Sequence, residues 1–240
     1  MRILLLITLL AFAPGCTDRN NDGRNYEGEE DHNNQQDFAS RAGYLALGDS
    51  YTIGEGVAED ERWPVQLARA ISKDTLKVDP VHIVAQTGWT TSDLLNGITQ
   101  ENLKAEYDMV SLLIGVNNQY QGLDPQIYRT EFDSLLQIAV NYAGGLSEKV
   151  FVLSIPDYGV TPFASSRDSA LIRKEIDRYN EMADSICDRY GVPFFNITPI
   201  SREALTDRSL LAPDNLHPSG KQYGLWVEAI EDSVTTILER

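Results

Sequence analysis

The sequence predicts an α/β domain built on a central parallel sheet of about five strands. Three observations favour this class. Short apolar runs alternate with longer amphipathic runs from about residue 43 onward. The short runs are apolar at consecutive positions, which is typical of strands buried on both faces. After residue 40, neither an internal repeat nor a long linker divides the chain. Strands that alternate with helices imply right-handed crossovers and helices on both faces of the sheet.

The predicted strands are short and rich in aliphatic residues. Each is followed by a polar or glycine-containing segment, where the chain turns away from the sheet. In open α/β sheets, ligands bind beyond the carboxyl ends of the strands, so these segments are the first place to look for chemistry. The strand candidates are residues 44–47, 81–85, 109–114, 150–155 and 192–196.

Four helices are predicted from apolar residues that recur at helical spacing. Pro64 suits the first turn of the first helix, and Gly144 with Gly145 ends the second. The fourth helix follows Pro218, which we expect in its first turn. The four apolar faces comprise Trp63, Leu67, Ala70 and Ile71; Tyr128, Phe132, Leu135, Leu136, Ala139 and Val140; Leu171, Ile176, Tyr179, Met182, Ile186 and Tyr190; and Tyr223, Trp226, Val227, Ile230, Val234 and Ile237.

Residues 1–16 have the composition of a secretory signal. Arg2 precedes an apolar run over residues 3–12, which is too short to cross a hydrocarbon core of about 30 Å as a helix. The run leads through Ala13, Pro14 and Gly15 to Cys16. This ending resembles the lipobox of bacterial lipoproteins, in which the cysteine is lipidated and becomes the mature N-terminus. The alternative is an ordinary secretory signal with an incidental cysteine.

The segment that follows, residues 17–40, is dominated by Asp, Asn, Glu and Gly and has little to bury. We expect a disordered tether there, and a single folded domain over residues 41–240. Together with a lipidated Cys16, the tether predicts a protein anchored to a membrane of the bacterial cell envelope, on the periplasmic or outer surface. Without lipidation the protein would be secreted.

Charge and cysteine content narrow the classes of partner. The formal net charge of −16 argues against nucleic acid and against electrostatic attraction to anionic lipid. After removal of the signal, Cys187 is the only thiol beyond Cys16, so the domain can form no internal disulfide. Cys187 has no second cysteine nearby and is interpreted as a small core residue. We expect a monomer.

The first polar segment after a predicted strand contains a candidate nucleophile. Gly48, Asp49, Ser50 and Tyr51 follow residues 44–47 directly. A serine at the carboxyl end of a strand can present its hydroxyl above the sheet, although these residue types are common in ordinary turns. The Gly-x-Ser-x-Gly pattern of the nucleophile elbow is absent, so a nucleophilic Ser50 would belong to another serine-hydrolase architecture.

A serine nucleophile needs a base, and the chain has 3 histidines. His32 lies in the predicted tether, and His82 lies in an apolar strand, where a structural role is favoured. His217 lies just before the last predicted helix, three residues after Asp214. Asp214 could accept a ring N–H and fix the tautomer of the imidazole. The alternative is that Asp214 forms an Asx turn and His217 simply caps the helix.

Acyl transfer also needs donors directed at the developing oxyanion. The side-chain amide of Asn117, two residues after Gly115, follows the third predicted strand. The backbone N–H of Gly88, after the second strand, has no side chain beside it, and the N–H of Ser50 is a third candidate. Taken one by one, Gly88 and Asn117 are typical turn residues. Trp89 and Tyr120 lie near these segments and are candidates for lining a substrate pocket or for packing.

These four segments, in this order, resemble the conserved blocks of the SGNH (GDSL-type) hydrolase superfamily. The matching residues are Gly48-Asp49-Ser50, Gly88, Gly115-x-Asn117 and Asp214-x-x-His217, and the resemblance covers residues 44–238. It implies a three-layer, flavodoxin-like fold and ester hydrolysis without a metal or other cofactor. It also implies that Ser50 is the nucleophile, His217 the base and Asp214 its orienting partner. Ser50, Gly88 and Asn117 would form the oxyanion hole.

Two positions depart from the pattern of the superfamily. Tyr51 replaces the leucine of the GDSL motif, at a position that varies among its members. Asn118 replaces an aspartate whose carboxylate braces the loop, which bears on how Asn117 is placed. Asp49 is expected to brace its own turn.

The resemblance leaves the substrate open among acyl or acetyl esters of lipids, aryl alcohols and carbohydrates. The loop over residues 157–163 is suited to shaping the pocket. A catalytically inactive surface lipoprotein that binds a glycan or lipid is the alternative function. A two-metal phosphoesterase is excluded because the folded region has too few histidines and no Asp-x-His motif.

Overall fold

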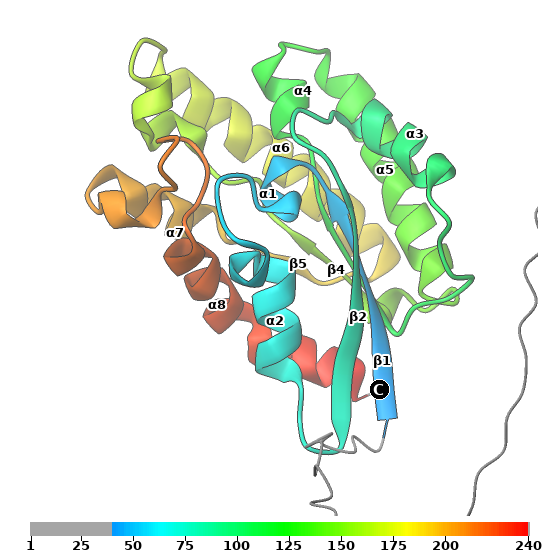
Figure 1. The fold of residues 1–240 in the computed structure, drawn as a ribbon. Helices are drawn as coiled ribbons and strands as arrows, with labels where there is room; N and C mark the ends of the chain where they lie inside the picture. Colours follow the sequence, from blue (N-terminus) through cyan, green and yellow to red (C-terminus); the bar gives the residue numbers. More distant parts are fainter. Residues whose placement is uncertain (1–39, 240) are drawn as a thin grey trace, which may run out of the picture. The chain divides into compact units, whose positions relative to one another are not determined.

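The computed structural model describes residues 40–239 and has a five-stranded sheet at its centre, in the order β2-β1-β3-β4-β5 (Figure 1). Every neighbouring pair of strands is parallel. The prediction of an α/β domain with a parallel sheet of about five strands is confirmed. The strands are β1 (Ser40–Gly48), β2 (Leu76–Ala85), β3 (Met109–Leu113), β4 (Val150–Leu153) and β5 (Phe194–Phe195).

The strands differ from their predicted bounds at the two edges of the sheet and at β1, which begins four residues earlier than predicted. The first edge strand, β2, begins five residues earlier than predicted, because its amino-terminal half pairs with the start of β1. Pro80 lies within β2, which an edge strand tolerates because one side of it needs no partner. The opposite edge strand, β5, keeps only two of the five predicted residues. The central strand β3 is buried at every position.

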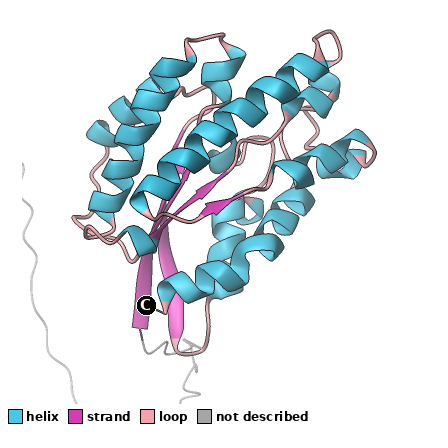
Figure 2. Cartoon of the chain, turned by 180° about the vertical axis from the view of Figure 1, so that it is seen from behind, coloured by secondary structure: helices cyan, strands magenta, loops and turns pink. Residues whose placement is uncertain are grey.

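Helices cover both faces of the sheet, which gives three layers (Figures 1 and 2). On one side α2 packs against α8, and on the other side α5 contacts both α3 and α6. The four predicted helices correspond to α2, α5, α6 and α8. The helices are α1 (Ser50–Ile53), α2 (Trp63–Ile71), α3 (Thr91–Gln100), α4 (Val116–Tyr120), α5 (Pro125–Tyr142), α6 (Ser169–Tyr190), α7 (Thr198–Arg202) and α8 (Gly220–Leu238).

Helix α3 was not predicted from the sequence. Its buried face is short, with Thr91, Leu94, Gly97 and Ile98 at helical spacing, and it also carries a start signal. Thr90 caps the helix by accepting from the backbone N–H of Asp93, and the Asp93 carboxylate accepts from the backbone N–H of Thr90. This reciprocal pair is a capping box with aspartate at its third position.

Three details of the predicted helices are wrong. Ala70 is exposed, because Ala68 lies on the buried face of α2 instead. Leu171 is half exposed, because Ile172 turns toward the core of α6. Pro218 is not in the first turn of α8, since Ser219 is the N-cap and its hydroxyl accepts from the N–H of Gln222.

His82 and Cys187, which were interpreted as structural residues from the sequence, both lie in packed surroundings. His82 Nδ1 lies 3.0 Å from the hydroxyl of Tyr107, and the two rings meet edge to face. Cys187 is fully buried, and burial raises the pKa of its thiol to about 12, which keeps it protonated and unreactive.

The predicted signal sequence, Cys16 and His32 lie outside the described residues. So does the predicted tether except for Ser40, which begins β1 and pairs with Leu76. Across residues 40–239, every helix is too short or too polar to span a bilayer.

Candidate active site

The segments that follow β1, β2, β3 and β4 meet the loop before α8 around one cavity of about 170 Å³. It lies at the carboxyl ends of the strands, the position expected for a ligand site in this architecture. All three catalytic candidates with a side chain in reach of substrate, Ser50, Asn117 and His217, line it together with Gly88. The remaining lining residues are Tyr51, Thr87, Val116, Tyr120, Tyr158, Phe163 and Leu216.

Ser50 stands at the start of α1, where the strand β1 turns sharply into a helix. Asp49 caps this helix: its Oδ1 accepts from the N–H of Tyr51 at 3.0 Å. Gly48 is required here, because an added Cβ would lie 2.2 Å from Thr52 Oγ1 and 2.5 Å from the carbonyl oxygen of Leu113. Ser50 is only 5% exposed in this turn, and it lines the cavity.

The Asp49 carboxyl is completely buried, and its Oδ2 has no hydrogen-bond partner among residues 40–239. Burial raises its pKa to about 7, against the opposing effect of backbone donors such as the N–H of Tyr51. This geometry agrees with the expected bracing role, since Asp49 holds the turn and Ser50 faces the cavity.

The loop before α8 joins His217 to Asp214 at close range. His217 Nδ1 lies 2.6 Å from Asp214 Oδ2, while Asp214 Oδ1 accepts from the backbone N–H groups of Leu216 and His217 at 2.9 and 3.0 Å. Partial burial opposes ionisation of Asp214, but these hydrogen bonds hold its pKa below the usual range. Asn215, between the two, adopts a positive φ of 60°, which asparagine tolerates better than most residues.

This arrangement orients the imidazole toward the cavity. Because Nδ1 faces Asp214, Nε2 is the ring nitrogen left for a substrate or for Ser50. The ring of Tyr51 lies against His217 edge to face, with centroids 5.7 Å apart. Within residues 40–239, no hydrogen bond joins Ser50 Oγ to the imidazole. Such bonds are often long in a ligand-free site and tighten when substrate binds.

The two oxyanion candidates beyond Ser50 lie on the same cavity. Gly88 has a φ of +87°, so a side chain there would be strained even though the space beside it is open. Its N–H has no acceptor in the described part of the chain. Asn117 donates one amide hydrogen to the carbonyl oxygen of Trp89 at 2.9 Å, which fixes its side chain and leaves its second hydrogen free to donate.

Asn118, the departure from the superfamily pattern, braces the same region through its amide. Its side chain is fully buried, accepts from the N–H of Thr91 at 3.0 Å and donates to Thr91 Oγ1 at 2.7 Å. Thr91 Oγ1 in turn donates to Glu131, so a carboxylate still ends this chain of hydrogen bonds. The brace beside Asn117 is therefore present, with its charge on Glu131 of α5.

Of the two aromatic residues singled out from the sequence, only Tyr120 lines the cavity. Trp89 packs over α3 instead, where a Cβ on Gly97 would lie 2.3 Å from its ring. The predicted pocket loop contributes Tyr158 and Phe163. Sequence reasoning missed Thr87, Val116 and Leu216, and their only signal is adjacency to Gly88, Asn117 and His217. Residues 40–239 contain no group of His, Cys, Asp and Glu side chains able to hold a metal ion.

Solved structures with a similar fold include proteins described as esterases. The chain is similar to TesA, with 16% identity, a TM-score of 0.62, and coverage of 81% of this chain and 99% of TesA. It is also similar to the psychrotrophic esterase EstA from Pseudoalteromonas sp., with 16% identity, a TM-score of 0.61, and coverage of 83% of this chain and 100% of EstA. A third similar structure is the acetylxylan esterase Axe2 from Geobacillus stearothermophilus, with 19% identity, a TM-score of 0.60, and coverage of 80% of this chain and 94% of Axe2. A search of curated proteins finds no match to this sequence.

The fold, with its cavity at the carboxyl ends of the strands, is thus that of the SGNH/GDSL hydrolases. The sequence over residues 46–225 matches the family model of the GDSL-like lipase/acylhydrolase family. The chain belongs to this family.

Proposed function

We propose that this protein is a serine esterase that cleaves carboxylic esters through Ser50, His217 and Asp214. The observation that supports this most directly is the 2.6 Å contact between His217 Nδ1 and Asp214, which directs the other ring nitrogen into the cavity that Ser50 lines. A glycan- or lipid-binding protein would have no use for this arrangement.

In the proposed first half-reaction, Ser50 Oγ attacks the carbonyl carbon of the ester while His217 Nε2 takes the hydroxyl proton. Asp214, held ionised by its backbone donors, stabilises the imidazolium that forms. The tetrahedral intermediate then collapses: the bond to the alcohol oxygen breaks, His217 returns the proton to that oxygen, and the acyl group stays on Ser50.

In the second half-reaction, water replaces the alcohol. His217 takes a proton from the water as it attacks the acyl-enzyme, and Ser50 leaves with that proton when the carboxylic acid is released. In both steps the negative charge on the carbonyl oxygen would be stabilised by the N–H groups of Ser50 and Gly88 and by the amide of Asn117. The fixed side chain of Asn117 means that this donor needs little reorganisation.

The cavity supports an uncharged group as the bound part of the ester. Apart from the catalytic imidazole, its lining residues are aromatic, aliphatic or neutral polar. Acyl or acetyl esters of lipids, aryl alcohols and carbohydrates all meet this requirement. We further propose that the enzyme acts at the bacterial cell envelope, held by a lipid on Cys16, as a monomer without a cofactor or nucleic acid partner.

A fluorophosphonate probe tests the proposed nucleophile. Labelling of the wild-type protein that is lost in Ser50→Ala and kept in Ser134→Ala supports the enzyme; Ser134 lies on α5 and bonds to the carbonyl oxygen of Thr130. Peptide mapping of the labelled protein should give Ser50. Failure of the probe to label correctly folded protein would instead favour the inactive binding protein.

The proposed anchor is tested by separation of membranes from the soluble envelope fraction. Cys16→Ser should release the protein into the soluble fraction, while Cys187→Ser, at the buried thiol, should leave it on the membrane. If Cys16→Ser remains with the membrane, lipidation is refuted.

A further inference from the structure

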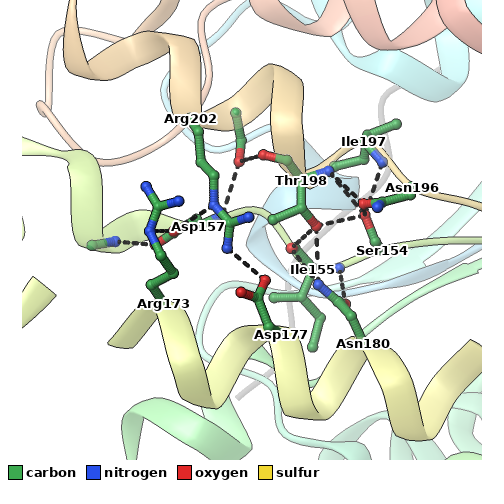
Figure 3. Close-up of polar contacts among 12 residues, drawn as sticks. Ser154, Ile155, Asp157, Arg173, Asp177, Asn180, Asn196, Ile197, Thr198 and Arg202 are labelled. Carbon is green, nitrogen blue, oxygen red and sulfur yellow. Dashed lines mark hydrogen bonds and ion pairs between the residues drawn. The ribbon is translucent and has the colours of Figure 1, made fainter. Parts of the chain in front are cut away.

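The segment that follows β4 supplies one wall of the catalytic cavity through Tyr158 and Phe163. It forms two short 3₁₀ turns, Tyr158–Val160 and Pro162–Ala164, and no part of it belongs to the sheet. Its shape therefore depends on contacts other than strand pairing. Figure 3 shows that side chains from α6 and α7 gather around the start of this segment.

Ile155, the second residue after β4, is held by side chains at both of its backbone polar groups. Its N–H donates to Asn180 Oδ1 at 2.7 Å, and its carbonyl oxygen accepts from Asn180 Nδ2 at 3.2 Å and from Thr198 Oγ1 at 2.8 Å (Figure 3). Asn180 lies on α6 and Thr198 on α7, so two helices replace the missing strand partners.

Two residues further on, Asp157 is held through an ion network. Its carboxylate is buried, with 1% side-chain exposure, and accepts from Arg202 Nε at 2.8 Å; Arg173 Nε lies 3.9 Å away. Arg202 is fixed in turn by Asp177, at 2.5 Å. The other oxygen of Asp157 accepts from the N–H of Gly159, which shapes the turn that carries Tyr158. None of these charged groups lines the cavity.

Tyr158 and Phe163, which follow Asp157 in the segment, contact Tyr120, and Phe163 also contacts the loop that carries His217. The ring of Tyr120 lies 5.9 Å from that of Tyr158 and 6.0 Å from that of Phe163. The N–H of Phe163 donates to the carbonyl oxygen of Asn215, two residues before His217, at 3.3 Å. The wall therefore packs against Tyr120 of α4 and is joined to the segment that carries His217.

We propose that residues 155–164 form the element that selects the acyl group, and that Arg202 is a positioning residue that holds this element in place from outside the cavity. The inference rests on the proposed function. In that reaction the alcohol departs after the first half-reaction, whereas the acyl group remains on Ser50, which lines the uncharged cavity. The cavity is small, about 170 Å³, which favours a short acyl chain.

The test is a pair of ester series measured with the full-length enzyme. In the first, the acyl chain of a 4-nitrophenyl ester grows from acetate to decanoate; in the second, the acyl group is acetate and the alcohol grows. We expect kcat/KM of the wild-type enzyme to fall in the first series beyond about six carbons, and to change much less in the second. Phe163→Ala should raise the ratio of decanoate to butanoate kcat/KM by about tenfold.

Arg202→Lys and Asp177→Asn test the positioning role. Both variants keep a cation near the buried Asp157 but weaken the contacts that fix residue 202. Because Asp177 is 45% exposed, its substitution leaves no buried charge unpaired. We expect KM for butanoate to rise about threefold to tenfold and the chain-length profile to flatten, with kcat on acetate and fluorophosphonate labelling within about twofold of wild type. The matched control is Arg189→Lys, since Arg189 of α6 and Asp133 of α5 have the same 2.8 Å separation and neither lines the cavity.

The outcomes separate the two proposals. If the wild-type enzyme turns over no ester, the proposed function fails. If it is active but Phe163→Ala keeps the wild-type acyl profile, or the alcohol series responds instead, the assignment of the acyl group is wrong. If Arg202→Lys and Asp177→Asn lower kcat equally on every ester, or behave as Arg189→Lys does, Arg202 is not a positioning residue.

Discussion

Two loops border the cavity and are built in opposite ways. The loop of the base is held by contacts within itself: Asp214 and His217 are three residues apart, and Asp214 binds the backbone of the same turn. The loop after β4 also forms turns of its own, but its start is held by side chains that arrive from α6 and α7. In the proposed function, the first loop would supply the base and the second would shape the cavity.

This difference indicates how the two functions can vary. A self-contained turn keeps the geometry of the base when the rest of the molecule changes, because its contacts move with it. A wall held by distant helices can be reshaped by substitutions on those helices without disturbing the turn. The comparison predicts that changes in the first loop abolish turnover, whereas changes around the second shift selectivity and stability.

The largest effect should follow from removal of the nucleophile or base. Ser50→Ala and His217→Ala should each lower kcat on an activated ester by about 10⁴–10⁶, because proton transfer and attack act as one unit. The double variant should be little worse than either single one. The measurement is the steady-state rate on a 4-nitrophenyl ester, with circular dichroism to confirm folding. Near-normal turnover by His217→Ala would falsify the proposed triad.

A smaller effect is expected at the oxyanion donor. Asn117→Ala should lower kcat by roughly 10²–10³ with KM little changed, since its amide would act mainly on the charge that develops during reaction. Gln121→Ala, at the exposed residue that follows α4, is the control for disturbance of that helix. A loss in KM instead of kcat would show that Asn117 binds the ground state.

The self-contained turn is also the part of the site that the sequence predicts best. Asp214-x-x-His217 and Gly48-Asp49-Ser50 are each formed by neighbouring residues. Spacing alone left the Asp214–His217 contact as one of two alternatives, and the resemblance to the superfamily favoured this contact and the bracing role of Asp49. The parallel sheet was predictable for a similar reason, because the buried strands are apolar on both faces. The position of Gly88 and Asn117 on the same cavity followed from their place at the carboxyl ends of two predicted strands of an α/β sheet.

The wall could not be predicted in the same way. Ile155 contacts Asn180 and Thr198 across sequence separations of 25 and 43 residues, and no local pattern specifies such contacts. The sequence therefore placed the loop near the pocket but gave no sign of what fixes it. Helix α3 was missed because half of its short buried face consists of Thr91 and Gly97, which do not stand out as apolar. Leu171 was assigned to the core because Ile172 beside it is equally apolar.

Substitutions that loosen the wall should lower the free energy of unfolding, whereas substitutions in the loop of Asp214 and His217 should lower activity. Arg202→Met removes the closest cation from the buried Asp157 and should lower the free energy of unfolding by about 2–4 kcal/mol, less than for a fully buried pair because Arg202 is partly exposed and Arg173 remains nearby. Arg41→Met, at the exposed Arg41–Asp79 pair, should cost under about 1 kcal/mol. Urea unfolding measures both, and equal losses would contradict the buried network as the source of rigidity.

The pH dependence of stability should distinguish Asp49 from both loops. Burial raises the pKa of this carboxyl to about 7, so the folded protein keeps its proton while the unfolded chain releases it at lower pH. Between about pH 4 and 7 the folded state therefore binds more protons, and the free energy of unfolding falls as pH rises, by at most about 1.4 kcal/mol per pH unit. Above pH 7 both states are ionised and the contribution levels off.

Asp49→Asn isolates this effect, because asparagine can still accept from the N–H of Tyr51 but cannot ionise. We expect the difference in unfolding free energy between Asp49→Asn and the wild-type protein to grow in favour of the variant from pH 4 to 7 and then to stay constant. Asp214→Asn should show the opposite trend, since the pKa of Asp214 is lowered in the folded state and its stabilisation is lost as pH falls through the acid range. Parallel pH profiles for the two variants would show that burial does not govern the protonation of Asp49.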